Sequence, residues 1–209
     1  MERRAVIFDL GGVILGSPLH AIGEYERDHR IESGFINRVV VDTGRTGAWA
    51  RLERGELAME AFFTAFEDDC ASAGRTISAR VLMERIGAVT EPRPQMLEAV
   101  RRLRAHGLRT AALTNNWPGD ETRQQPLKAF FDAFVESSVV GLRKPDPAIY
   151  HHVCAEIDVT PPEAIFLDDI GSNLKTARAL GMETIKVDDP DEALRALEAV
   201  VELALLDER

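Results

Sequence analysis

Residues 5–12 read Ala5-Val6-Ile7-Phe8-Asp9-Leu10-Gly11-Gly12, an apolar run that ends in an aspartate and a pair of glycines. A short continuous apolar run is typical of a strand that is buried on both faces of a parallel sheet. The glycines allow the tight turn that follows such a strand. This stretch therefore predicts a buried strand with Asp9 at its carboxyl end.

Three later segments repeat this design of an apolar strand followed by polar residues, at 109–113, 164–167 and 184–187. Helical patterns separate them at 94–105, 147–157 and 174–180, and leucines and valines recur at helical spacing over 193–206. Asp146-Pro147 and Asp189-Pro190 each place a capping acid before a proline, which predicts two helix starts. Alternating strands and helices predict an α/β fold, a Rossmann-like, doubly wound parallel sheet.

Residues 17–93 differ from the rest, because they contain helical patterns and no convincing buried strand. We expect a core made of residues 1–16 and 94–209, with an all-helical insertion at 17–93 between its two parts. Phe62, Phe63, Phe66 and Cys70 recur near helical spacing within the insertion. They suit a small hydrophobic core of its own, and equally the wall of an apolar channel.

Composition excludes several classes of function. The chain has 209 residues, with 25 Lys and Arg against 35 Asp and Glu, so its formal net charge is 25 − 35 = −10. This balance argues against binding to nucleic acid or to an anionic membrane surface.

No apolar run approaches the roughly 18 residues of a membrane span, so we expect no membrane insertion and a cytoplasmic location. Cys70 and Cys154 lack neighbours at metal-ligand spacing, which argues against structural zinc and a disulfide framework. The oligomeric state stays open.

The candidate site lies at the carboxyl ends of the strands, where ligands bind in open parallel sheets. The chemically capable residues expected there are Asp9, Gly11, Thr114, Asn115, Lys144, Asp168, Asp169 and Asn173. Carboxylates that separate strands bring together repel each other unless a cation lies between them. Mg²⁺ meets this need, since it prefers one or two carboxylates and completes its shell with water and phosphate oxygens. With Lys144 as a second positive charge, such a site suits a phosphate.

Four motifs, in this order, resemble those of the haloacid dehalogenase superfamily. They are Val6 to Val13, Leu113-Thr114-Asn115, Lys144 within Gly141 to Pro147, and Phe166 to Asp169. The insertion matches the family's C1 cap in position and size. Residues 113–117 and 166–175 are also similar to the N-terminal phosphatase domain of soluble epoxide hydrolase and to the related domain that precedes some acyl-CoA dehydrogenases.

The resemblance implies a magnesium-dependent phosphomonoester hydrolase. In it, the Asp9 carboxylate attacks phosphorus and forms an aspartyl-phosphate that water hydrolyses. Thr114 and Asn115 hold the phosphate, and Lys144 offsets charge on the transferring group. The implied substrate is a small phosphorylated molecule, and analogy with the epoxide-hydrolase domain suggests lipid phosphates.

The resemblance also implies a ligand set for Mg²⁺: the carboxylates of Asp9 and Asp169 and the backbone carbonyl of Gly11. Asp168 and Asn173 are expected to orient either a metal-bound water or the lysine. Trp117 follows the second motif directly, and we expect it to face the insertion and shape the pocket.

The sequence departs from the family pattern at Gly11. Phosphatases of this superfamily usually carry there an aspartate that moves a proton, and losing such a group costs about 10² to 10⁴ in rate. Three readings follow: a phosphatase in which another group compensates, an impaired domain that binds a phosphorylated ligand or partner, and a 2-haloacid dehalogenase, which attacks carbon without magnesium. The Asp168-Asp169 pair makes the last reading the weakest. The identity of the substrate stays open.

Overall fold

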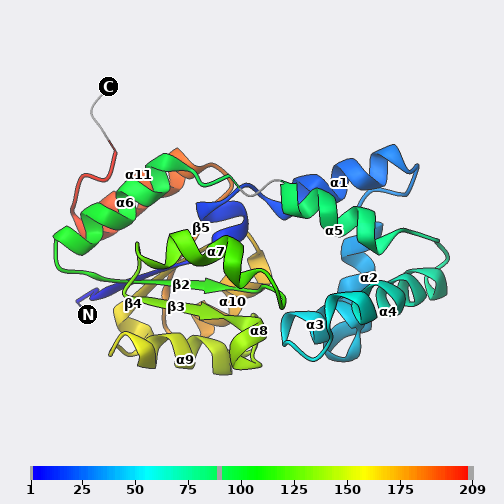
Figure 1. The fold of residues 1–209 in the computed structure, drawn as a ribbon. Coiled ribbons are helices and arrows are strands. Elements are labelled where there is room, and N and C mark those ends of the chain that lie inside the picture. Colours follow the sequence, from blue (N-terminus) through cyan, green and yellow to red (C-terminus); the bar gives the residue numbers. More distant parts are fainter. Residues whose placement is uncertain (1, 89–90, 207–209) are drawn as a thin grey trace.

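The computed structural model describes residues 2–88 and 91–206 (Figure 1). Its elements follow a βα order with a block of helices after the first strand. In chain order they are β1 (Ala5–Phe8), the irregular turn η1 (Leu10–Ile14), α1 (Pro18–Asp28), α2 (Phe35–Thr43), η2 (Gly44–Thr46), α3 (Ala48–Glu53), α4 (Met59–Ser72), α5 (Ala79–Ala88), α6 (Pro94–Ala105), β2 (Arg109–Thr114), α7 (Glu121–Lys128), β3 (Ala133–Glu136), α8 (Ser137–Val140), α9 (Pro147–Glu156), η3 (Pro161–Glu163), β4 (Ala164–Asp168), α10 (Gly171–Ala179), β5 (Glu183–Lys186) and α11 (Pro190–Val201).

The five strands form one parallel sheet in the order β3-β2-β1-β4-β5. This arrangement confirms the predicted doubly wound α/β fold. The sequence patterns located four of the strands to within one residue at each end, but they missed β3. That strand lies at the edge of the sheet, has four residues and is only half-buried at its start. Because β1 is central, its carboxyl end lies between the ends of β2 and β4.

Alternate residues of β1 pack into separate layers on the two faces of the sheet. Val6 and Phe8 belong to one buried cluster with side chains of α6 and α11, whereas Ala5 and Ile7 belong to another with side chains of α9 and α10. Figure 1 shows α6 and α11 together over one face and α9 over the other. A strand covered on both sides requires the continuous apolar run from which it was predicted.

Both predicted capping aspartates cap helices. The side chain of Asp146 accepts a hydrogen bond from the Ala148 N–H at 3.0 Å, and that of Asp189 accepts one from the Glu192 N–H at 2.9 Å. Each satisfies a backbone donor that the first turn of its helix leaves without a partner.

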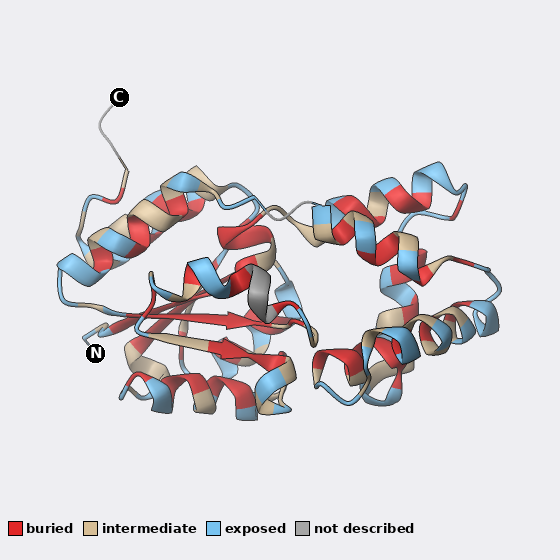
Figure 2. Ribbon diagram, viewed as in Figure 1, coloured by how far each residue is buried: buried red, intermediate tan, exposed pale blue. Residues whose placement is uncertain are grey.

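The helical insertion, α1 to α5, has a hydrophobic cluster of its own (Figures 1 and 2). Phe62, Phe66 and Cys70 are fully buried in it, and Phe63 packs against it. Trp49 meets the rings of Phe62 and Phe66 at centroid distances of 5.7 and 5.2 Å. This confirms the prediction of a separate small core in the insertion.

Two segments that lie side by side connect the insertion to the sheet. Leu15 and Pro92 form an antiparallel bridge, and the N–H of Arg93 donates to the carbonyl of Ile14 at 2.8 Å. The Arg93 guanidinium also donates to the Gly12 carbonyl at 2.6 Å. We propose that the boundaries between insertion and core fall at these segments, at residues 16/17 and 93/94.

In the described part of the chain, no helix has the length and apolar character needed to cross a membrane. Cys70 and Cys154 are both buried free thiols.

We predict that Phe66→Ala lowers the free energy of unfolding by about 3 kcal/mol, because it leaves a cavity beneath the Phe62 and Trp49 rings. Urea unfolding followed by circular dichroism measures the change. Val139→Ala is the matched surface control, since Val139 is 65% exposed, and its effect should stay within about 0.5 kcal/mol. An unchanged urea midpoint for Phe66→Ala would contradict the assignment of a separate core.

Candidate functional site

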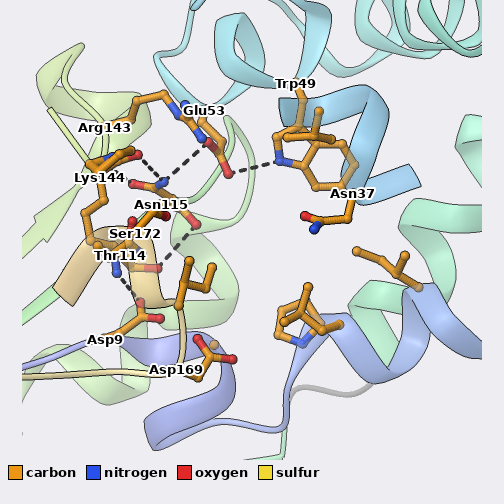
Figure 3. A pocket seen from close by; sticks show the side chains of 18 of the residues that line it. Asp9, Asn37, Trp49, Glu53, Thr114, Asn115, Arg143, Lys144, Asp169 and Ser172 are labelled. Atoms are coloured by element: carbon orange, nitrogen blue, oxygen red, sulfur yellow. Dashed lines mark hydrogen bonds and ion pairs between the residues drawn. The ribbon is translucent and has the colours of Figure 1, made fainter. Parts of the chain in front are cut away.

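The expected site residues converge at the carboxyl ends of β1, β2 and β4. Asp9 follows β1, Thr114 ends β2 and Asp168 ends β4, and these strands are neighbours in the sheet. The Asp9 N–H donates to the Leu167 carbonyl at 2.9 Å, which fixes the backbone of Asp9 against β4. Figure 3 shows Asp9, Thr114, Lys144 and Asp169 grouped at one end of a pocket.

Lys144 lies at the centre of this group, and it is only 1% exposed. Its ammonium contacts Asp9 Oδ1 at 2.7 Å and Asp168 Oδ2 at 2.8 Å. Burial by itself would lower the pKa of Lys144, but the two carboxylates outweigh burial and raise that pKa. The lysine therefore stays charged in the buried site.

Asp168 holds the lysine in place. Both of its oxygens accept hydrogen bonds from Asn173 Nδ2, at 3.0 and 3.1 Å, and Oδ1 also accepts from the Ile170 N–H at 2.7 Å. The Asn173 carbonyl in turn accepts from the Tyr150 hydroxyl at 3.0 Å. Of the two roles expected for Asp168 and Asn173, these contacts favour the one in which they orient Lys144.

The donor set fits a hard divalent cation. Ligand oxygens of Asp9, Asp168 and Asp169 lie within 4.8 Å of one another. Asp169 Oδ2 accepts from the Ser17 hydroxyl at 3.3 Å, whereas Oδ1 is buried without a hydrogen-bond partner in the described part of the chain. Burial and the neighbouring Asp168 raise the pKa of Asp169 to about 6, and burial above all raises the pKa of Asp9 to about 8. A cation would reduce the repulsion between the carboxylates, and it would give Asp169 Oδ1 a partner.

Gly12 gives Asp169 its space. A Cβ at position 12 would lie 2.1 Å from Asp169 Oδ2, and the φ of +82° is one that side-chain-bearing residues rarely adopt. The second glycine of the opening motif is thus required both by the turn and by the close approach of a carboxylate.

Asn115 fastens the loop that carries the lysine. Its side-chain Oδ1 accepts from the Lys144 N–H at 2.8 Å, and its Nδ2 donates to the Lys144 carbonyl at 3.0 Å. Thr114, beside it, is 3% exposed. The sequence pointed to both residues as phosphate ligands, but it did not indicate that the Asn115 side chain clamps the Lys144 backbone.

A cavity of about 290 Å³ lies between these polar groups and the helical insertion. Its far wall is mostly apolar, with Ile22, Ile36, Val40 and Trp49 from the insertion and Trp117 from the core. Trp117 also packs against the insertion's hydrophobic cluster, as its position in the sequence suggested. By contrast, the phenylalanines of α4 do not line this cavity, so of the two alternatives for them the structure favours packing within the insertion.

The sequence patterns did not indicate two charged residues of the cavity wall, Glu53 and Arg143. The Arg143 guanidinium pairs through Nε with Glu53 Oε2 at 2.5 Å, and the Trp49 indole donates to Glu53 Oε1 at 3.0 Å. Burial raises the pKa of Glu53, against the opposing effect of Arg143. The position of Arg143 next to Lys144 could have indicated that it lies near the site. Nothing in the helical pattern of α3 distinguishes Glu53.

Comparisons with known proteins place these motifs in a family. The model of the haloacid dehalogenase-like hydrolases matches residues 3–181. Acyl-CoA dehydrogenase family member 10 of Mus musculus is 39% identical over 203 residues, which cover 95% of this chain and 19% of that protein. Bifunctional epoxide hydrolase 2 of Sus scrofa is 34% identical over 222 residues, which cover 99% and 40%. The chain thus spans less than half the length of these two relatives.

Other similar proteins match this chain over nearly their whole length. A sesquiterpene phosphatase of Aspergillus oryzae is 26% identical over 190 residues, which cover 89% of this chain and 90% of that protein. A solved structure of a HAD-like family hydrolase from Porphyromonas gingivalis has the same fold. It superposes with a TM-score of 0.68 at 23% identity and covers 98% of this chain and 100% of its own.

We predict that Gly12→Ala weakens Mg²⁺ binding about 10-fold or more, because the new methyl group displaces the Asp169 carboxylate. Titration calorimetry with MgCl₂ measures the affinity. Gly74→Ala is the matched control: Gly74 also has a positive φ, +95°, but a Cβ there meets nothing within 4 Å. Equal Mg²⁺ affinities in the two variants would contradict the role of Asp169 as a ligand.

Proposed function

We propose that this chain, which belongs to the haloacid dehalogenase-like hydrolase family, is a magnesium-dependent phosphomonoesterase that acts through an aspartyl-phosphate on Asp9. One observation carries the proposal: a buried ammonium joins two carboxylates beside a third, and all of them lie at the polar end of a cavity. The similarity to a sesquiterpene phosphatase over nearly the full chain supports the same reaction class.

The reaction begins when a carboxylate oxygen of Asp9 forms a bond to phosphorus. The bond between phosphorus and the leaving oxygen breaks, and its electron pair stays on that oxygen. Water then hydrolyses the aspartyl-phosphate, which releases phosphate and restores the carboxylate. Lys144 contacts Asp9 at 2.7 Å, so it orients the nucleophile and offsets negative charge on the transferring group.

Thr114 and the backbone amide of Asn115 are proposed to hold the phosphate, since both line the cavity next to Lys144. Asp9, Asp169 and the Gly11 carbonyl would hold Mg²⁺. When bound, the ion would offset the charge of the carboxylates and of the phosphoryl oxygens. Asp168 and Asn173 would keep the lysine in position.

The cavity favours an organic phosphate whose leaving group is largely apolar. Its wall combines Ile36, Val40, Trp49 and Trp117 on the side away from Asp9. Burial of an apolar group there contributes binding energy in proportion to the area removed from water. We therefore propose lipid or other small organic phosphates as substrates.

A second candidate function rests on Gly11, where the usual acid–base aspartate is absent. A Cβ at this position would lie 3.1 Å from both Cδ and Cγ of Pro18, the first residue of α1. The proline ring thus crowds an aspartate side chain at position 11 and would have to shift by a few tenths of an ångström to admit it. This observation favours a slow or inactive domain that binds a phosphorylated ligand as the alternative to an active phosphatase.

Asp9→Asn is expected to reduce phosphate release from para-nitrophenyl phosphate by about 10³-fold or more, because an amide is a poor nucleophile. Removal of Mg²⁺ with EDTA should have a similar effect on the unmodified chain. The control Asp188→Asn makes the same change at an exposed position that is ion-paired with Lys186, and it should keep full activity. Unchanged turnover in Asp9→Asn would refute the mechanism. A folded unmodified chain that binds phosphate with Mg²⁺ but does not turn over would favour the second candidate.

Restoring the missing acid should depend on Pro18. Gly11 has φ −66° and ψ 123°, values that aspartate adopts without strain. The obstacle is therefore the proline ring, and Gly11→Asp combined with Pro18→Ala should turn over para-nitrophenyl phosphate about 10-fold faster than Gly11→Asp alone. Pro18→Ala by itself serves as the control. No difference between the single and double variants would show that Pro18 does not restrict this position.

A further inference from the structure

The cavity wall carries a buried carboxylate that the proposed reaction does not use. Glu53, the last residue of α3, is 7% exposed. It lies away from Asp9 in the pocket, and its carboxylate faces Arg143 and Trp49 (Figure 3). Glu53 belongs to the insertion, whereas Arg143 lies 90 residues later, in the core next to Lys144. The ion pair therefore joins the two parts of the molecule at the site.

A third contact extends this link toward the reaction centre. Asn115 Nδ2 donates to Glu53 Oε2 at 3.4 Å and to the Lys144 carbonyl at 3.0 Å. Asn115 Oδ1 accepts from the Lys144 N–H. Hydrogen bonds thus connect α3, through Asn115, to the backbone of Lys144. The ammonium at the end of the same lysine contacts Asp9.

Resting on the proposed function, we propose that Glu53 is a positioning residue, which holds the insertion against the core in the arrangement that places Asn115 and Lys144 for phosphoryl transfer. A buried charge is stable only while it is paired, and withdrawal of α3 from the core would separate Glu53 from Arg143 and Asn115. The insertion and the phosphate-binding loop are therefore stabilised in one common arrangement. Turnover then depends on the docking of the insertion as well as on the residues that contact phosphate.

The contacts of Glu53 argue against a role in proton transfer. Trp49 occupies Oε1, and Arg143 and Asn115 share Oε2. Each oxygen of Glu53 is thus held by donors of the chain rather than directed at the reacting groups, and the guanidinium opposes the rise in pKa that burial causes. Glu53 therefore does not replace the acid that is missing at Gly11, and it acts through Asn115 and Lys144.

The test is a double-mutant cycle of Glu53→Gln, Arg143→Gln and the double variant, with Mg²⁺ and para-nitrophenyl phosphate as the probe. We expect each single variant to lower kcat about 10-fold while KM changes less than about 2-fold, because the catalytic groups lose their alignment. The double variant should lose no more than either single one, since both remove the same interaction. Glu56→Gln is the matched control, because Glu56 is exposed, lies three residues along the chain and pairs with Arg54.

Two kinetic results would overturn the proposal: single effects that multiply in the double variant, or a Glu53→Gln variant as active as Glu56→Gln. A purely structural role would lower the melting temperature but leave kcat unchanged at a temperature where every variant is folded.

A binding readout separates this proposal from the proposed function. In a Trp117→Phe background, Trp49 is the single remaining tryptophan, and its indole contacts Glu53 directly. Inorganic phosphate with Mg²⁺ should change its fluorescence, and Glu53→Gln should abolish that change. A chain without turnover that still gives this response would refute the phosphatase and support the coupling. A response that is the same in Glu53→Gln, or absent without the substitution, would refute the coupling.

Discussion

One buried ammonium organises the site. Lys144 has almost no contact with solvent and stays charged because Asp9 and Asp168 face it at hydrogen-bond distance. A charge in such a place is destabilising unless its partners are fixed, and the fold fixes them by placing both at the ends of neighbouring parallel strands. The clamp of Asn115 on the backbone, and the support of Asn173 behind Asp168, then hold the lysine in one position.

The same pairing leaves the site with excess negative charge. Three carboxylates gather around one lysine, and an oxygen of Asp169 has no hydrogen-bond partner among the described residues. In the proposed function a divalent cation would supply the complementary positive charge for the carboxylates and the phosphoryl group, and the helical insertion adds an apolar wall to the cavity. In the proposed function, the polar end of the cavity holds the reacting groups and the apolar end holds the leaving group. Glu53 and Arg143 join the two ends.

The sequence was most informative where a strand is buried on both faces. Such strands read as apolar runs, and the polar residue that ends each run marks the site, which is how Asp9, Thr114 and Asp168 were located. The edge strand β3 was missed because its first two residues are only partly buried and it carries no such run. The Glu53–Arg143 pair could not be predicted from the sequence. The two residues are 90 positions apart in the chain and meet only because α3 packs against the core. The sequence showed that an acid is absent at Gly11, but it did not show that the Pro18 ring crowds this position.

The role of Asp9 as the nucleophile can be tested by trapping the covalent intermediate. The chain is mixed with Mg²⁺ and para-nitrophenyl phosphate, quenched in acid during turnover, and examined by intact and peptide mass spectrometry. If Asp9 is the nucleophile, the peptide that contains Asp9 carries a phosphoryl adduct, and the adduct is absent from Asp9→Asn. Turnover with the adduct on another residue, or turnover with no adduct at any quench time, would contradict this role of Asp9.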